Sequence, residues 1–210
     1  MKKVLLFGFF MIITGFAFSL NRKSYLELSF ENSERQLSEF SCGFAALTAV
    51  LRNFYEIDIS QERLMEEYGN DLLKEQRGIS FLDMKKISEL KGLTALGFSV
   101  NFSAFEEFVA YSKVPIIVHE MKDKKDINSG HFIIVIGEKE NCFYILDPTY
   151  GEQYISKKSL RKTMTGNILL ILPPDSSPDK DALVNYAHNK MLEILNNNKM
   201  EKMNFYENYY

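Results

Sequence analysis

A helix that begins at a cysteine constrains this chain more than any other feature. After Cys42, apolar residues recur at helical spacing, at Leu47, Leu51 and Phe54, and alanines between them allow close packing. Cys42 therefore falls in the first turn of a buried helix, with Ser41 as the predicted N-cap. The unpaired N–H groups and the positive dipole end of that turn favour a thiolate, so Cys42 is a candidate nucleophile.

The partners of Cys42 decide its role, because a free cysteine is more often a small packed hydrophobe than a catalyst. Gln36 lies six positions upstream (42 − 36), where its side-chain amide can donate a hydrogen bond beside the sulfur. A side-chain amide and the backbone N–H of the nucleophile together make an oxyanion hole. We therefore expect Gln36 to be the oxyanion donor.

Two apolar runs later in the chain predict a hairpin that joins a histidine to an aspartate. The first run begins at His131, and the second begins at Cys142 and ends at Asp147. A short polar turn separates them, which suits antiparallel strands, so His131 and Asp147 lie at the same edge. A cysteine, a histidine base and an orienting carboxylate form a nucleophilic triad.

Two of these residues have competitors. His119 ends another apolar run near the same edge, but we favour His131 as the base because Asp147 lies across the hairpin from it. Cys142 could form a disulfide with Cys42 in an exported protein. The triad instead predicts two thiols, with Cys142 as a packed structural residue.

Five short motifs follow one another along the chain. They are Gln-x5-Cys-Gly-x-Ala from Gln36, Gly78-Ile79-Ser80, Pro115-Ile116-Ile117-Val118-His119, Gly130-His131-Phe132, and Ile145-Leu146-Asp147-Pro148 with Gly151. Together they resemble the bacteriocin-processing cysteine peptidases that cleave double-glycine leaders, cysteine peptidase family 39, from about Gln36 to Leu172. The resemblance implies a papain-like fold with Cys42 as nucleophile, His131 as base, Asp147 as orienter and Gln36 as oxyanion donor.

Such domains are best known as the N-terminal part of peptide-exporting ABC transporters. No Gly-x4-Gly-Lys-Ser/Thr segment and no long membrane domain follow the match here, so the resemblance implies a stand-alone member. It also implies cleavage after a small pair such as Gly-Gly, no metal or other cofactor, and as partners a polypeptide substrate and an export machinery. Related stand-alone domains occur in pathways that export functional amyloid.

Two other functions stay open at this point. A papain-like cell-wall peptide hydrolase of the NlpC kind usually has its cysteine in an Asp-Cys-Ser-Gly setting, and Ser41-Cys42-Gly43-Phe44 is different. A non-cleaving domain of an export pathway would bind a leader or client peptide in the same cleft. The joint presence of Cys42, His131 and Asp147 argues against that reading.

The order of the expected elements predicts an α+β fold, with N-terminal helices packed on a C-terminal antiparallel sheet. Helices are expected to begin at Ser60, Ser80 and Ser156, the first two as plausible caps. Alternating polar and apolar residues predict an extended segment at 25–30 and a strand with one buried face at 96–102. Ser103 is the expected cap of the helix that follows.

The first residues are typical of a secretory signal. Two lysines precede an uncharged run from Val4 to Leu20, and small residues predict cleavage after Ser19. Two basic residues follow directly, so an uncleaved membrane anchor is the alternative. We expect residues 1–19 to be the signal peptide or anchor, 20–172 the peptidase domain, 173–178 a linker and 179–210 a helical tail, in a periplasmic or extracellular protein.

Charge limits the partners. The 210 residues carry a formal net charge of −3, which gives no basic footprint for nucleic acid. We therefore expect no nucleic-acid partner, and membrane contact only through the N-terminal segment if that segment is uncleaved.

Overall fold

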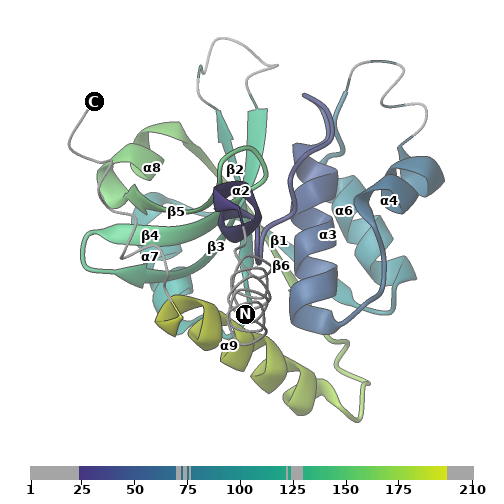
Figure 1. Ribbon diagram of the computed structural model, residues 1–210. Coiled ribbons are helices and arrows are strands. Elements are labelled where there is room, and N and C mark those ends of the chain that lie inside the picture. The colour runs from purple at the N-terminus through teal and green to yellow at the C-terminus, as the bar shows by residue number, and fades with distance from the viewer. Residues whose placement is uncertain are drawn as a thin grey trace, which may run out of the picture.

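In the computed structural model, helices α3, α4 and α6 stand beside a twisted antiparallel sheet (Figure 1). The structure describes residues 24–197, apart from residues 70, 71, 73, 74, 76, 122 and 124–129. The predicted signal segment 1–19 and the end of the predicted tail lie outside the described residues. Within the described part of the chain, none of the helices is both long enough and apolar enough to cross a bilayer. The expected α+β class is confirmed.

The helices begin where capping side chains allow them. Ser60, Ser80 and Ser156 each accept a hydrogen bond from the backbone of the third helical residue, as predicted for the first two. The helices are α2 (Tyr25–Ser29), α3 (Cys42–Tyr55), α4 (Gln61–Tyr68), α6 (Phe81–Leu90), α7 (Phe102–Tyr111), α8 (Lys157–Thr163) and α9 (Lys180–Asn196). Helix α3 is buried along most of its length and forms the centre of the core.

Six strands form one sheet in the order β1-β6-β2-β3-β4-β5, and every neighbouring pair is antiparallel. The strands are β1 (Thr94–Ser99), β2 (Ile116–Met121), β3 (Gly130–Lys139), β4 (Cys142–Asp147), β5 (Gly151–Ser156) and β6 (Met164–Leu172). Strands β3 and β4 form the predicted hairpin, with Ile134 opposite Leu146. The start of β3 and the end of β4 therefore lie at the same edge.

Three local predictions were wrong. Residues 25–29 form helix α2, because Ser24 and Glu27 make a reciprocal capping box that stabilises a helix start. Leu96 and Phe98 are about two-fifths exposed, since β1 is an edge strand in which Ala95 is the fully buried residue. Helix α7 is capped by Asn101 rather than Ser103.

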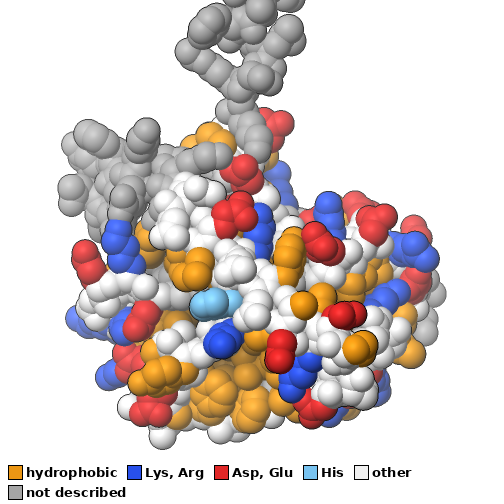
Figure 2. All heavy atoms as spheres, turned by 90° about the horizontal axis from the view of Figure 1, so that it is seen from below, with side chains coloured by type: hydrophobic (Ala, Val, Ile, Leu, Met, Phe, Trp, Pro, Cys, Tyr) orange, Lys and Arg blue, Asp and Glu red, His pale blue; other side chains and the backbone are white. Residues whose placement is uncertain are grey.

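Helix α9 packs on the domain. Its buried residues Ala187, Met191 and Ile194 recur at helical spacing and lie against α3 and β3. Figure 1 shows α9 running beneath both the helical side and the sheet. Figure 2 views the molecule from that side, where acidic and basic side chains are interspersed around a patch of hydrophobic ones, in keeping with the small net charge of −3.

Candidate active site

Cys42 is the first residue of α3 and is buried, with 6% of its surface exposed. The N–H groups of a first helical turn have no partner within the helix, so the sulfur lies in a positive local field. Ser41 is at the N-cap position, but its hydroxyl does not cap the helix. It accepts hydrogen bonds from the backbone N–H groups of Leu37 and Ser38 instead, at 2.9 and 2.8 Å. The predicted capping bond of Ser41 is therefore wrong.

The backbone next to Cys42 packs closely against its surroundings. A Cβ atom on Gly43 would lie 2.8 Å from Ile79 Cγ1 and 2.9 Å from Met84 Cε. Glycine at this position lets the first turn of α3 approach the segment before α6 and the start of α6 itself. The Cys-Gly pair thus places the sulfur as well as supplying it.

His131 and Asp147 form the hydrogen bond that the hairpin predicted. His131 Nε2 lies 2.9 Å from Asp147 Oδ1, and both residues are more than nine-tenths buried. The same carboxylate oxygen accepts from the backbone N–H groups of Thr149 and Tyr150, at 2.7 and 3.3 Å. The turn after β4 therefore holds Asp147 in the orientation that His131 needs.

The Cys42 side chain also lies beside His131. Burial on its own would lower the pKa of His131, but the hydrogen bonds with Asp147 and Cys42 and their negative charge raise that pKa to about 10. Because Nε2 of His131 faces Asp147, Nδ1 is the ring nitrogen that is left to face the Cys42 sulfur. A protonated imidazole at neutral pH beside a sulfur at a helix start is a suitable pair for nucleophilic attack.

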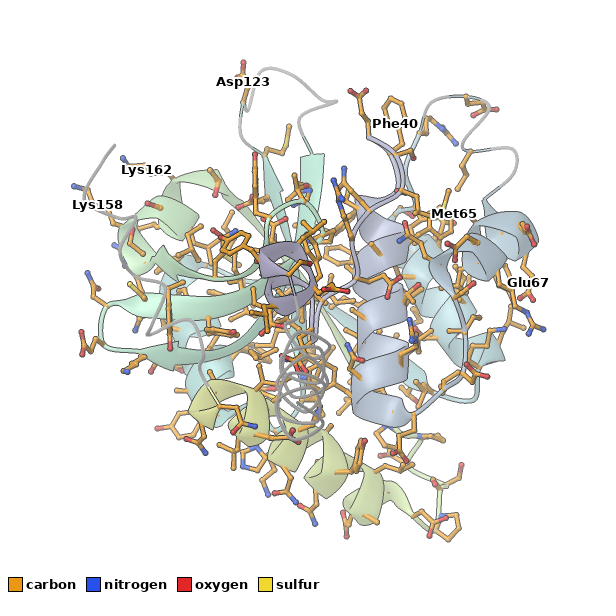
Figure 3. All side chains as sticks on the ribbon, viewed as in Figure 1. Phe40, Met65, Glu67, Asp123, Lys158 and Lys162 are labelled. Atoms are coloured by element: carbon orange, nitrogen blue, oxygen red, sulfur yellow. The ribbon has the colours of Figure 1, made fainter. Side chains whose placement is uncertain are left out.

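Gln36 is attached to the turn that carries Asp147. Its backbone N–H donates to the carbonyl of Pro148 at 2.9 Å, and its side-chain Oε1 accepts from Thr149 Oγ1 at 3.1 Å. Because Oε1 is occupied by Thr149, the Nε2 group of Gln36 is left as the donor. Gln36 belongs to an irregular segment, the site loop (residues 35–41), that leads directly into α3. Figure 3 places Phe40 of this loop at the same end of the molecule as Asp123, which follows β2.

His119 is close to the site but has other partners. Its Nδ1 lies 3.2 Å from Thr165 Oγ1, and its ring packs on Phe132 with centroids 4.9 Å apart. Burial, and then the positive charge of His131, lower the pKa of His119. The structure pairs His131, and not His119, with Asp147.

Sequence reasoning missed the residues that hold the N-terminal segment between strand β5 and helix α3. The buried Glu152 accepts from the backbone N–H and the side-chain amide of Asn32, at 2.6 and 3.1 Å, and Asn53 of α3 donates to the Asn32 carbonyl at 2.7 Å. Gln61 of α4 bonds to the site loop. One available signal was that Gln61 shares a helical face with the core residue Leu64, so a polar residue there needs buried partners.

Both Cys42 and Cys142 keep their thiols and are not joined in a disulfide. In the described part of the chain, no group of three or more histidine, cysteine, aspartate or glutamate side chains is placed to hold a metal ion. Cys42, His131 and Asp147 thus lie together, with Gln36 attached to the turn that follows Asp147, and these are the side-chain types that acyl transfer requires.

In a comparison with protein families, residues 31–176 fit the model of the peptidase C39 family. The chain is 29% identical over 155 residues to the probable functional amyloid protease FapD of Pseudomonas fluorescens, covering 71% of this chain and 64% of that protein. It is 28% identical over 155 residues to the lactococcin-A transport/processing ATP-binding protein LcnC of Lactococcus lactis, covering 72% of this chain and 20% of that protein. The chain thus spans less than two thirds of these relatives.

Solved structures agree with the fold. A double glycine motif protease from an AMS/PCAT transporter, in complex with the leader peptide, superposes with a TM-score of 0.54 at 26% identity, covering 67% of this chain and 89% of that chain. The peptidase domain of Streptococcus ComA, a bifunctional ABC transporter, superposes with a TM-score of 0.57 at 24% identity, covering 68% and 98%.

Proposed function

The chain belongs to the peptidase C39 family, and on that premise we propose that it is a cysteine endopeptidase in which Cys42 is the nucleophile, His131 the base and Asp147 the residue that orients His131. One observation carries the proposal. Cys42, at the start of a buried helix, lies beside His131, and Nε2 of His131 lies 2.9 Å from Asp147 Oδ1. These are the contacts that a thiolate nucleophile and its base require.

The reaction follows from these positions. The Cys42 thiolate attacks the peptide carbonyl carbon and forms a C–S bond, while Gln36 Nε2 and the Cys42 N–H donate to the developing oxyanion. The tetrahedral intermediate collapses, the C–N bond breaks, and the leaving amine takes the proton from His131. His131 then accepts a proton from water, which attacks the thioester and releases the acid and the Cys42 thiolate.

The proposed substrate is a secreted or leader-bearing polypeptide that is cut after a small pair of the Gly-Gly type. This rests on likeness to relatives: one solved structure is a double glycine motif protease bound to its leader peptide, and another relative is a probable functional amyloid protease. An export machinery is the proposed partner. The apolar residues before Leu20 support a location outside the cytoplasm, reached by a cleaved signal or kept by an anchor.

The first test measures the reactivity of the proposed nucleophile. The full chain is treated with iodoacetamide at pH 6, and the labelling rates of Cys42 and Cys142 are followed by mass spectrometry. Cys42 should react faster, since the thiolate is the reacting form. His131→Ala should slow Cys42 to the rate of an ordinary thiol, whereas His119→Ala should leave it fast.

The second test measures cleavage. Synthetic leader peptides with a Gly-Gly pair are incubated with the wild type and with Cys42→Ala, and the products are identified by mass. We expect a new carboxyl terminus after the small pair in the wild-type reaction alone. Binding of these peptides without any cleavage, together with equal and slow labelling of both cysteines, would establish the non-cleaving alternative.

A further inference from the structure

Gln61 is buried at the start of α4, beside the site loop. No part of its surface is exposed, although a glutamine side chain is costly to bury without hydrogen bonds. Its Nε2 donates to the carbonyl oxygen of Arg35 at 2.9 Å, and its Oε1 accepts from the N–H of Leu37 at 3.2 Å. One amide thus binds the backbone on both sides of Gln36.

The site loop has few other means of staying in place. It forms no helix or strand, and Leu37 is 55% exposed, so apolar packing does not fix the backbone there. The Leu37 N–H is shared between Gln61 and the Ser41 hydroxyl, and the Gln36 N–H donates to Pro148. Polar contacts from α4, from the start of α3 and from the turn after β4 therefore set the position of Gln36.

A buried amide needs hydrogen bonds wherever it lies, so satisfied bonds alone would not assign a role to Gln61. The choice of partners does. The two bonds end on the two peptide groups that flank Gln36, and among the described residues α4 makes no other hydrogen bond to the site loop. Figure 3 shows α4, with Met65 and Glu67 labelled, standing beside α3 rather than over the sheet.

We propose that Gln61 is a positioning residue, which holds the site loop so that the Gln36 amide can donate to the oxyanion. The inference rests on the proposed function, because Gln36 has a role only if Cys42 attacks a carbonyl. Gln61 touches neither the substrate nor the sulfur. Its loss should therefore change the reaction through Gln36 and leave the pairing of Cys42 with His131 intact.

The test is a double-mutant cycle on turnover of a fluorogenic peptide that carries Gly-Gly before the scissile bond. Gln61→Met keeps the length and apolar volume of the side chain and removes both hydrogen bonds. It should lower kcat by about tenfold or more, short of the 10²–10³-fold loss expected for removing the donor itself, with KM within about twofold. In a Gln36→Ala background, Gln61→Met should have no further effect on kcat.

Two controls separate positioning from a general loss of stability. Leu64→Ala removes another fully buried side chain of α4 and none of the hydrogen bonds to the site loop, so it should lower the melting temperature and leave kcat unchanged at temperatures well below melting. Iodoacetamide labelling of Cys42 should be equally fast in wild type and Gln61→Met. If the Met variant does not fold, Gln61→Asn, which is one methylene too short to make both bonds, replaces it.

The outcomes separate the two proposals. Fast selective labelling and peptide cleavage by wild type, with kcat unchanged in Gln61→Met, would overturn the inference and leave the proposed function standing. Equal losses of kcat in the wild-type and Gln36→Ala backgrounds would overturn it too, since Gln61 would then act independently of Gln36. A wild type that labels slowly and cleaves nothing would refute the proposed function, and the inference with it.

Discussion

Single residues decide whether this site can stabilise an oxyanion. Gln36 is the one whose removal should affect activity with the least effect on folding. Its side chain is partly exposed and bonds to Thr149 alone among the hydrogen bonds recorded for the described residues. Gln36→Ala should therefore fold normally and lose about 10²–10³ in kcat. Steady-state kinetics and a thermal melt check this, with the exposed neighbour Glu39→Ala as the matched control. Near-normal turnover of Gln36→Ala would remove it from the mechanism.

The pairing of His131 with Asp147 and Cys42 has a consequence for stability. The pKa of His131 is raised from 6.5 to about 10 in the folded protein, so below pH 6.5 the group is protonated in both states and its full stabilisation is present. Between pH 6.5 and 10 the unfolded chain releases the proton and the folded protein keeps it. This contribution to the free energy of unfolding should therefore decrease as the pH rises.

Urea denaturation of wild type and His131→Asn at several pH values measures that contribution as the difference between them. The difference should shrink between about pH 8.5 and 10, because below about pH 8.5 the thiol of the unfolded chain takes up the proton that His131 releases on unfolding, and above it no such uptake offsets the loss. His119→Asn is the matched control, because the pKa of His119 is lowered and its contribution should instead grow as the pH rises toward 6.5. A wild-type to His131→Asn difference that stays constant between about pH 8.5 and 10 would contradict the pairing.

The residues whose side chains meet were predictable, and those that act through the backbone were not. His131 and Asp147 follow from the register of one hairpin, which a turn and two apolar runs specify. Gln61 and Ser41 bind peptide groups of the site loop, and every residue has such groups. The helical face that Gln61 shares with Leu64 indicates a buried amide, but no pattern of side chains identifies the peptide groups that it binds.

Among the elements, α3 depends on close approach at its second residue. Gly43→Ala would bring a Cβ to 2.8 Å from Ile79 and 3.2 Å from Phe132, so the first turn or its neighbours must move. We expect a net loss of about 1–2 kcal/mol, after the roughly 1 kcal/mol that alanine gains over glycine within a helix. Slower iodoacetamide labelling of Cys42 should accompany it.

Gly97→Ala provides the comparison for Gly43→Ala. A Cβ on Gly97 of the edge strand β1 meets its nearest atoms at 3.9 Å, which is ordinary contact. The free energy of unfolding of Gly97→Ala should stay within about 0.5 kcal/mol of wild type. Equal melting temperatures for the two variants would show that the first turn of α3 tolerates displacement.

Helices and strands were predicted correctly where a single local signal was present and no second signal opposed it. The serine caps at positions 60, 80 and 156 gave correct helix starts, and the strongly apolar strands β2 and β3 lie inside the sheet. At residues 25–29, alternation over a few residues competed with a capping box, and the capping box prevailed. The alternation of apolar residues predicted the strand β1 correctly. The position of β1 at the sheet edge was decided by its pairing with β6.

On the scale of the whole molecule, α9 joins the helical side to the sheet although it follows the last residue of the family match, 176. Met191 is 5% exposed and Leu192, its neighbour in sequence, is 43% exposed. Met191→Ala should lower the free energy of unfolding by about 2–5 kcal/mol, and Leu192→Ala by less than about 1 kcal/mol. Chemical denaturation of the full chain distinguishes them, and similar values would mean that α9 is not docked in solution.

Asn32 is bonded on one side to Glu152 of the sheet and on the other to Asn53 of α3, and a few residues later the same segment delivers Gln36. The segment that carries Gln36 therefore also links α3 to the sheet. Warming should break these hydrogen bonds of Asn32 first, because they are polar bonds near the surface while the core beneath is apolar. The protein should then lose its activity some degrees below its melting temperature and regain it on cooling.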